Sequence, residues 1–163
     1  MSTATATCPL PSAQDVGSLL GDLVGRTVTA DASRPRLRRL HQLAIATYTT
    51  TGHDLVSACL CDLAVAAALG ASLAMVPATI ANQSLSTGTL SSELLENATE
   101  VLNVASRWVN AEGSPRLVLG QVVAPRDEVP EDVLRLLEHV EVRVDFHVEI
   151  DGYGGGLLSV VGR

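Results

Sequence analysis

The sequence predicts an α+β fold in which a mainly antiparallel sheet is packed with helices. In segment 140–150, apolar and polar residues alternate almost without a break, as in a strand with one buried and one wet face. Two β-rich segments, 40–50 and 55–60, are joined by a Thr-Gly-His-Asp turn, which indicates a hairpin. Helix-like segments lie between these strands and favour helices packed on a sheet.

The first third of the chain is typical of a helix followed by a strand. Ser12-Ala-Gln-Asp15 fits a capping box, and the short helix that follows ends at Gly25. Segment 26–30 alternates like a strand. The next loop is rich in arginine and is either a docking patch for an acidic partner or simply solvated. Its arginines are Arg34, Arg36, Arg38 and Arg39.

The middle of the chain is apolar and uncharged between Asp62 and Glu93. Segment 63–81 is long enough to consider a membrane span. It is rich in alanine, however, is interrupted by Pro77 and lacks a basic flank. We therefore expect a buried helix capped by Asp62, followed by an uncharged loop over 77–90.

The last third repeats the order of a helix followed by strands. We expect a helix over 91–110, a strand over 116–125, and a short helix over 129–140 before the alternating strand. A DGYGGG turn then joins that strand to a final one over 157–161. The two halves therefore share a loose pattern of a helix plus three strands.

Size and charge restrict the class of function. The 163 residues suit one domain with a real core. The net charge of −7 and the aromatic share of 2% argue against nucleic-acid binding, which needs a basic surface. An acidic protein can still meet a basic patch on a protein partner.

The three cysteines do not form a disulfide framework by number or spacing. Cys59 and Cys61 are expected to place one thiol on each face of a strand, and no metal site is expected. The N-terminal residues lack the basic and apolar regions of a secretory signal, so we expect a cytoplasmic protein.

The polar side of helix 91–110 is unusual for a solvated face. It aligns Glu96, Glu100, Asn103, Arg107 and Asn110. Glu96 and Glu100 repel one turn apart, and asparagine is unfavourable at mid-helix. Either the face is only solvated or these residues meet a partner.

The pair Glu100-Val-Leu-Asn103 on an exposed helix of a small acidic α+β domain resembles the CheC/CheX/FliY phosphatases of bacterial chemotaxis. Glu96 and Ala98 match the acidic residue and the alanine that commonly precede the E-x-x-N motif of that family. The resemblance extends to the element order, with its repeat of a helix plus three strands, over residues 15–161. A single motif in the second half is closest to the CheX type, whose members tend to be homodimers.

That resemblance implies a CheX-like domain over 12–163 preceded by a flexible tail over 1–11. It implies hydrolysis of the aspartyl phosphate of a CheY-like receiver domain. Asn103 would position the water, and Glu100 would contact the lysine of the receiver. The expected partner-binding residues are Glu96, Arg107 and Asn110. No cofactor of its own is expected, because the receiver would hold the Mg²⁺.

The chain departs from the family at Arg107, where a glycine is usual. This arginine could obstruct a docking receiver or attract the phosphoryl group. A non-catalytic adaptor that binds a receiver or a flagellar-switch protein therefore stays open as an alternative. A small-ligand sensor that uses the apolar region and the Gly154-Gly155-Gly156 run is a third possibility, although that run better suits a hairpin turn.

Overall fold

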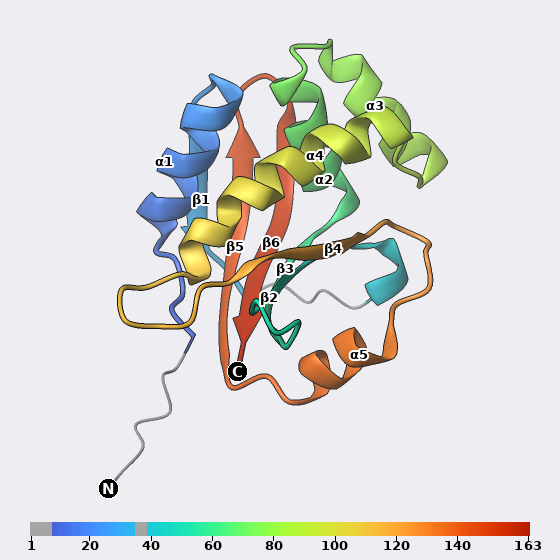
Figure 1. Cartoon of the computed structure of the whole chain (residues 1–163). Helices are drawn as coiled ribbons and strands as arrows, with labels where there is room; N and C mark the ends of the chain where they lie inside the picture. The colour runs from blue at the N-terminus through green and yellow to red at the C-terminus, as the bar shows by residue number, and fades with distance from the viewer. Residues whose placement is uncertain (1–7, 35–38) are drawn as a thin grey trace, which may run out of the picture.

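A computed structural model of the chain describes residues 8–34 and 39–163, which form one six-stranded antiparallel sheet with five α-helices (Figure 1). The helices are α1 (Ala13–Val24), α2 (Leu63–Leu73), α3 (Ala78–Thr87), α4 (Ser92–Val104) and α5 (Glu131–Glu138). The strands are β1 (Val28–Ala32), β2 (Ala44–Thr49), β3 (Leu55–Cys61), β4 (Val118–Val123), β5 (Val142–Ile150) and β6 (Gly154–Gly162). Two short 3-10 helices, η1 (Leu40–Gln42) and η2 (Ala105–Val109), complete the set. The predicted α+β class is confirmed.

Two predictions fall partly outside the described residues. The tail predicted over 1–11 includes the undescribed residues 1–7, whereas Cys8 and Pro11 near its end are buried. Arg36 and Arg38 of the arginine cluster also lie outside, and Arg34 and Arg39 are exposed.

The strand order shows an internal symmetry. The order is β1-β5-β6-β3-β2-β4, and every neighbouring pair is antiparallel. If β1, β2 and β3 are exchanged with β4, β5 and β6, the same order is read backwards. The two halves, which begin with α1 and α4, are therefore related by a pseudo-two-fold axis between β6 and β3.

Helices cover the two faces of the sheet unequally. The side chains of α1, α2 and α4 share one hydrophobic core with one face, whereas α5 packs on a smaller core on the other (Figure 1). Strand β2 is buried on both sides from Ala44 to Tyr48 because it lies between these layers. Strand β5 keeps its predicted alternation, with Phe146 and Val148 buried and His147 exposed.

The alanine-rich helix α2 lies at the centre of the helical layer. Residues Val65 to Ser72 are all buried. At Gly70, an added Cβ would overlap the backbone carbonyl of Leu94, so α2 and α4 cross in backbone contact. Small side chains permit this approach, which accounts for the alanine content. No described helix is long and apolar enough to cross a membrane.

The prediction of a loop over 77–90 is wrong, because most of this segment forms α3. Pro77 precedes the first helical residue, where its fixed φ and missing N–H are tolerated. Gly88 ends the helix in the left-handed conformation with φ +69. Ala81 and Ser84 are its buried residues, so two small side chains are enough to dock α3.

The helix predicted over 91–110 is shorter than expected. The hydroxyl of Ser91 accepts a hydrogen bond from the N–H of Leu94 and caps α4. The α-helix ends at Val104, and the chain continues as the tighter η2. Asn103 therefore lies in the last turn of α4 rather than at mid-helix.

The predicted placement of Cys59 and Cys61 on opposite faces is also wrong. Residues two apart in a strand point to the same side, and both thiols lie in the core beneath the helices. Cys8, Cys59 and Cys61 are free and buried. A hydrogen bond with Cys59 and burial raise the pKa of Cys61, so its thiol stays protonated and inert.

Candidate functional site

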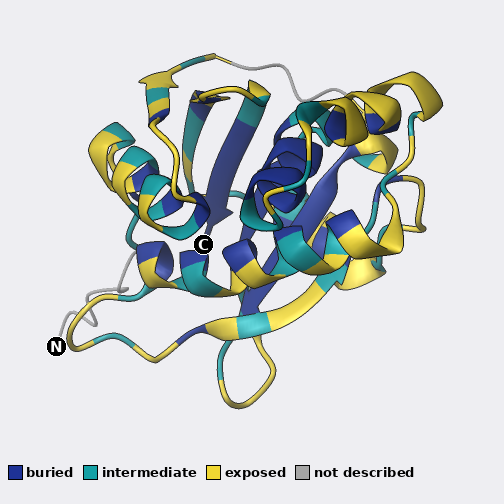
Figure 2. Ribbon diagram, turned by 90° about the horizontal axis from the view of Figure 1, so that it is seen from above, coloured by how far each residue is buried: buried dark blue, intermediate teal, exposed yellow. Residues whose placement is uncertain are grey.

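One side of α4 faces the core and the other faces solvent. Leu94, Ala98, Val101 and Leu102 are buried at helical spacing. Figure 2 shows buried residues gathered between the helices and the sheet, with exposed residues on the outer helix surfaces. Glu96, Glu100 and Asn103 are exposed on the outer side, so the carboxylate and the carboxamide stand one turn apart and face solvent.

The polar side chains of this outer face are not used by the fold. Within residues 8–34 and 39–163, no hydrogen bond or ion pair involves the side chain of Glu96, Glu100, Asn103 or Arg107. The side-chain hydrogen bond inside α4 comes instead from Thr99, whose hydroxyl donates to the carbonyl of Leu95 at 2.7 Å. The outer face therefore offers its polar groups to another molecule without losing an internal contact.

The backbone next to Asn103 is fixed from below by Tyr48. The phenol of Tyr48 donates a hydrogen bond of 2.8 Å to the carbonyl of Leu102. This carbonyl belongs to the last turn of α4, where carbonyls lack helical partners. Burial and the nearby Cys59 and Cys61 raise the pKa of Tyr48 well above its usual value, so the phenol stays a donor.

Asn110 has a structural role that the sequence did not indicate. Its Oδ1 accepts the N–H of Leu117 at 2.7 Å, and its Nδ2 donates to the carbonyls of Ser106 and Leu117 at 2.7 and 2.9 Å. Both amide protons are thus used inside the protein. The predicted partner contact by Asn110 is not supported by this geometry, and the residue instead joins η2 to the start of β4.

A hollow of about 470 Å³ opens between the end of α4, η2 and the start of β4. Its polar lining comes from Asn103, Ser106, Arg107 and Arg116, beside the inward-turned Asn110. We call it the arginine hollow. Arg116 was missed by the sequence because no local pattern shows that the start of β4 lies beside the end of α4.

The site contains groups suited to positioning rather than to nucleophilic attack. A carboxamide both accepts from a water and donates to an oxyanion, and it carries no charge that repels a phosphate. A carboxylate such as that of Glu100 pairs with a cation. Among the described residues, no three His, Cys, Asp or Glu side chains are close enough to hold a metal ion.

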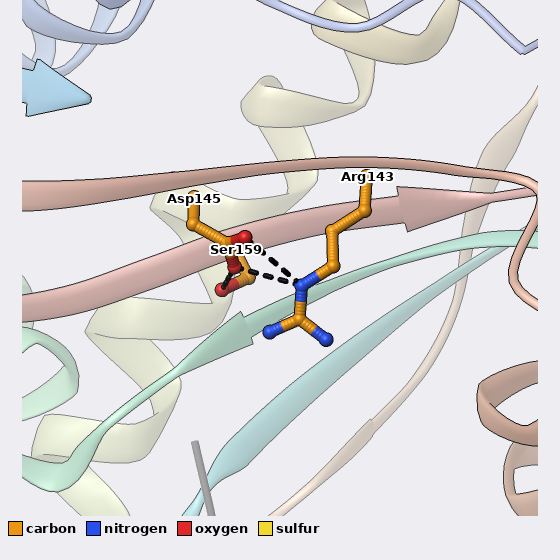
Figure 3. Close-up of polar contacts among 3 residues, drawn as sticks. All are labelled: Arg143, Asp145 and Ser159. Carbon is orange, nitrogen blue, oxygen red and sulfur yellow. Dashed lines mark hydrogen bonds and ion pairs between the residues drawn. The ribbon is translucent and has the colours of Figure 1, made fainter. Parts of the chain in front are cut away.

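A second polar cluster lies on β5 and β6, where Asp145 accepts from Arg143 and Ser159 (Figure 3). The Nε of Arg143 is 2.9 and 3.0 Å from the two oxygens of Asp145. Ser159 is fully buried, and its hydroxyl donates to this carboxylate. Because the Ser159 hydroxyl is buried and the carboxylate is also paired with Arg143, the cluster stabilises the strand pair and does not offer a nucleophile to solvent.

The glycine run considered for a ligand sensor lies in a hairpin, as expected. Residues 151–153 form the turn, and Gly154 begins β6. Gly156 lies against the carboxylate of Asp62, where no Cβ would fit. That carboxylate accepts from the N–H groups of Val65 and Leu157, so the run supports the cap of α2 rather than a phosphate.

Comparisons with known proteins give matches at the level of structure. No family model matches the sequence, and no curated protein matches it. A chain of the FliG–FliM complex from H. pylori has a TM-score of 0.61 at 9% identity, with 92% of this chain and 85% of that chain covered. A chain of the FliM–SpeE complex from H. pylori has a TM-score of 0.60 at 10% identity, covering 92% and 80%.

FliY from Thermotoga maritima has a TM-score of 0.53 at 12% identity, covering 89% of this chain and 80% of that chain. At these identities the likeness is one of fold, and it extends over nearly the whole chain. The expectation of a CheC-like and FliY-like architecture is therefore confirmed at this level. The chain has the fold shared by the FliM middle domain and FliY.

Proposed function

We propose that the chain binds a phosphorylated CheY-like receiver domain through the outer face of α4 and hydrolyses its aspartyl phosphate. One observation carries the proposal: Glu100 and Asn103 are exposed one turn apart, and no described residue engages their side chains. The bond from Tyr48 to the carbonyl of Leu102 fixes the backbone beneath the pair. The helix backbone that carries the pair therefore enters a pocket without first being ordered.

In this proposal the receiver supplies the Mg²⁺ and the lysine that neutralise the phosphoryl oxygens. Asn103 accepts a hydrogen bond from the attacking water and holds it in line. The water oxygen bonds to phosphorus as the bond to the aspartate oxygen breaks, the aspartate carboxylate leaves, and the protons of the water stay on the released inorganic phosphate. A loose transition state needs placement more than a strong base. Glu100 pairs with the lysine of the receiver and sets the register.

The finer features of the proposal follow the single E-x-x-N motif. We propose a CheX-type protein that acts in the cytoplasm as a homodimer. The dimer contact must leave the outer face of α4 open, because the receiver needs that face. Glu96 and Arg107 would contact the receiver on either side of the pair.

The test is the decay of phosphate from a CheY-type receiver labelled with acetyl phosphate. Wild type should accelerate the decay, and Asn103→Ala should lose at least about tenfold of that acceleration, equivalent to about 1.4 kcal/mol. Asn82→Ala, at an exposed asparagine of α3, is the matched control and should keep full activity. Equal decay with wild type and Asn103→Ala would refute the catalytic role.

A second candidate is a non-catalytic adaptor that binds a receiver or a flagellar-switch protein. It is favoured by Arg107, which lines the same hollow as Asn103 where the family usually has glycine. It is also supported by the fold likeness to FliM chains crystallised in complexes with FliG and with SpeE. Tight receiver binding with unchanged phosphate decay would establish this candidate and exclude the phosphatase.

A further inference from the structure

The chain carries positive charge beside Asn103 that its own fold does not use. Arg107 of η2 and Arg116, just before β4, are both exposed and both line the arginine hollow. The ion pairs found among the described residues lie elsewhere, on α5 and β5. In a protein of net charge −7, two arginines without a carboxylate partner at one opening indicate an anionic ligand.

The lining of the hollow agrees with this charge. No Asp or Glu side chain contributes to it, and Asn103 adds the amide of the proposed site. The carboxamide of Asn110 is turned inward and occupied, so the remaining polar side chains of the lining are the two arginines, the amide of Asn103 and the hydroxyl of Ser106. A volume of about 470 Å³ is ample for a phosphoryl group with its water.

We propose that the arginine hollow is an anion subsite that binds the phosphoryl group of a phosphorylated ligand. A guanidinium group donates two parallel hydrogen bonds to a pair of phosphoryl oxygens, so Arg107 and Arg116 have the chemistry that such a ligand needs. In a phosphoryl transfer, an added arginine also stabilises the charge of the transition state. Only the choice of a receiver aspartyl phosphate as the ligand rests on the proposed function.

The first helix offers a competitor for one of these arginines. Arg107 also lines a neighbouring hollow that contains Asp15 and Asp22 of α1. Their carboxylates attract the same guanidinium group that the phosphoryl group needs. Asp22→Asn should therefore strengthen phosphate binding, whereas Arg107→Gln should weaken it.

The direct experiment follows the arginine Nε–H signals by NMR while inorganic phosphate replaces chloride at constant ionic strength. Arg107 and Arg116 should shift with saturation, and substitution of either by Gln should weaken the binding at least about fivefold. Arg135→Gln is the matched control, because Arg135 is exposed on α5 and pairs with Glu131. Shifts that never saturate, or that are equal at Arg135, would overturn the inference.

A second arm uses the receiver itself, with and without beryllofluoride as the phosphoryl mimic. Arg116→Gln should weaken binding of the beryllofluoride form at least about threefold more than binding of the free form. If phosphate binds at the two arginines but Asn103→Ala does not change the decay of the receiver phosphate, the proposed function is refuted and the anion subsite is retained. If the decay of the receiver phosphate depends on Asn103 but no phosphate binds at the arginines, only the proposal of the anion subsite is refuted.

Discussion

Helices α1 and α4 are related by the pseudo-two-fold axis, and they pack on the same core but differ on their outer sides. Each begins with a serine N-cap and buries apolar residues at helical spacing against the same core. Their outer sides differ. On α1, the carboxylate of Asp15 accepts from the N–H of Ser12 and completes the cap. On α4, no hydrogen bond or ion pair among the described residues engages the carboxylate of Glu100, which lies in the face proposed for binding.

The two helices also end and pack differently. Helix α1 stops cleanly at Gly25 in the left-handed conformation, whereas α4 tightens into η2 and is held from below by Tyr48. Helix α1 approaches its neighbouring strand through Gly17, which lies against the carbonyl of Val28, whereas α4 is approached by Gly70 of α2. Helix α4, the proposed binding helix, thus depends on contacts from β2 and α2, and the predictions below separate these two contacts.

The largest effect on stability is expected from Gly70→Ala. The new Cβ would overlap the carbonyl of Leu94, which belongs to backbone and cannot rotate away. We expect a loss of about 2–3 kcal/mol in the free energy of unfolding, measured with urea. Gly52→Ala is the control, since its Cβ would meet only side chains at 3.7 and 3.9 Å.

Gly17→Ala, at the contact of α1 with Val28, should lower the free energy of unfolding less than Gly70→Ala does. Its Cβ would lie 2.9 Å from the carbonyl oxygen of Val28, and a small shift of α1 on its strand relieves this contact. If Gly70→Ala were no more destabilising than Gly52→Ala, the close crossing of α2 and α4 would be contradicted.

Tyr48→Phe is expected to come next. It leaves the buried carbonyl of Leu102 without its donor, at a cost of about 1–2 kcal/mol in the free energy of unfolding. It should also slow receiver dephosphorylation, because the last turn of α4 is loosened. Tyr153→Phe removes a similar bond to the carbonyl of Val76 and is the matched control. Equal dephosphorylation by both variants would show that Tyr48 does not support the site.

The smallest effects concern the two caps. Ser12→Ala and Ser91→Ala each remove a side-chain acceptor from a helix N-terminus and should each cost about 1 kcal/mol in the free energy of unfolding. Of the two caps, only that of α1 should contribute less to the free energy of unfolding as the pH falls. Hydrogen bonds from Ser12 lower the pKa of Asp15 from 3.8, so the unfolded chain takes up the proton first as the pH falls.

The contribution of Asp15 is therefore present above its unfolded pKa and is lost as the pH falls through its lower folded pKa. Asp15→Asn should be less stable than wild type at about pH 6, and this difference should shrink at an acidic pH below 3.8, where Asp15 of the folded protein takes up its proton. The cap at Ser91 has Leu94 where α1 has Asp15, so Ser91→Ala should cost the same at both pH values. An equal acid response at the two caps would contradict the distinction.

Local signals predicted much of this fold. The alternation along β5, the capping box at Ser12 and the cap at Asp62 all appear where the sequence indicates them. Helix α3 was missed because it has no charged side and buries only Ala81 and Ser84, so it shows no clear period. The change from α4 to η2 was missed because the apolar spacing continues through Trp108 and Val109.

The candidate site was predictable in its motif but not in its surroundings. Glu100 and Asn103 belong to one helix, so their spacing alone places them side by side. Tyr48 and Arg116 reach the end of α4 from β2 and from the start of β4, and only the sheet order brings these elements together. The use of Asn110 by the backbone of Leu117 is likewise a contact across a loop.

The decisive measurement is to map where a receiver touches the protein. A receiver activated with beryllofluoride is added to the isotope-labelled chain, and the backbone amide shifts are followed by NMR. We expect the changes to centre on α4 from Glu96 to Asn103 and on the neighbouring Arg107 and Arg116, with smaller changes on α1 where Asp15 and Asp22 lie beside Arg107. If the amide shift changes centre on α1 or α3, and the amides of α4 do not shift at saturating receiver, the proposal that the outer face of α4 is the binding surface is contradicted.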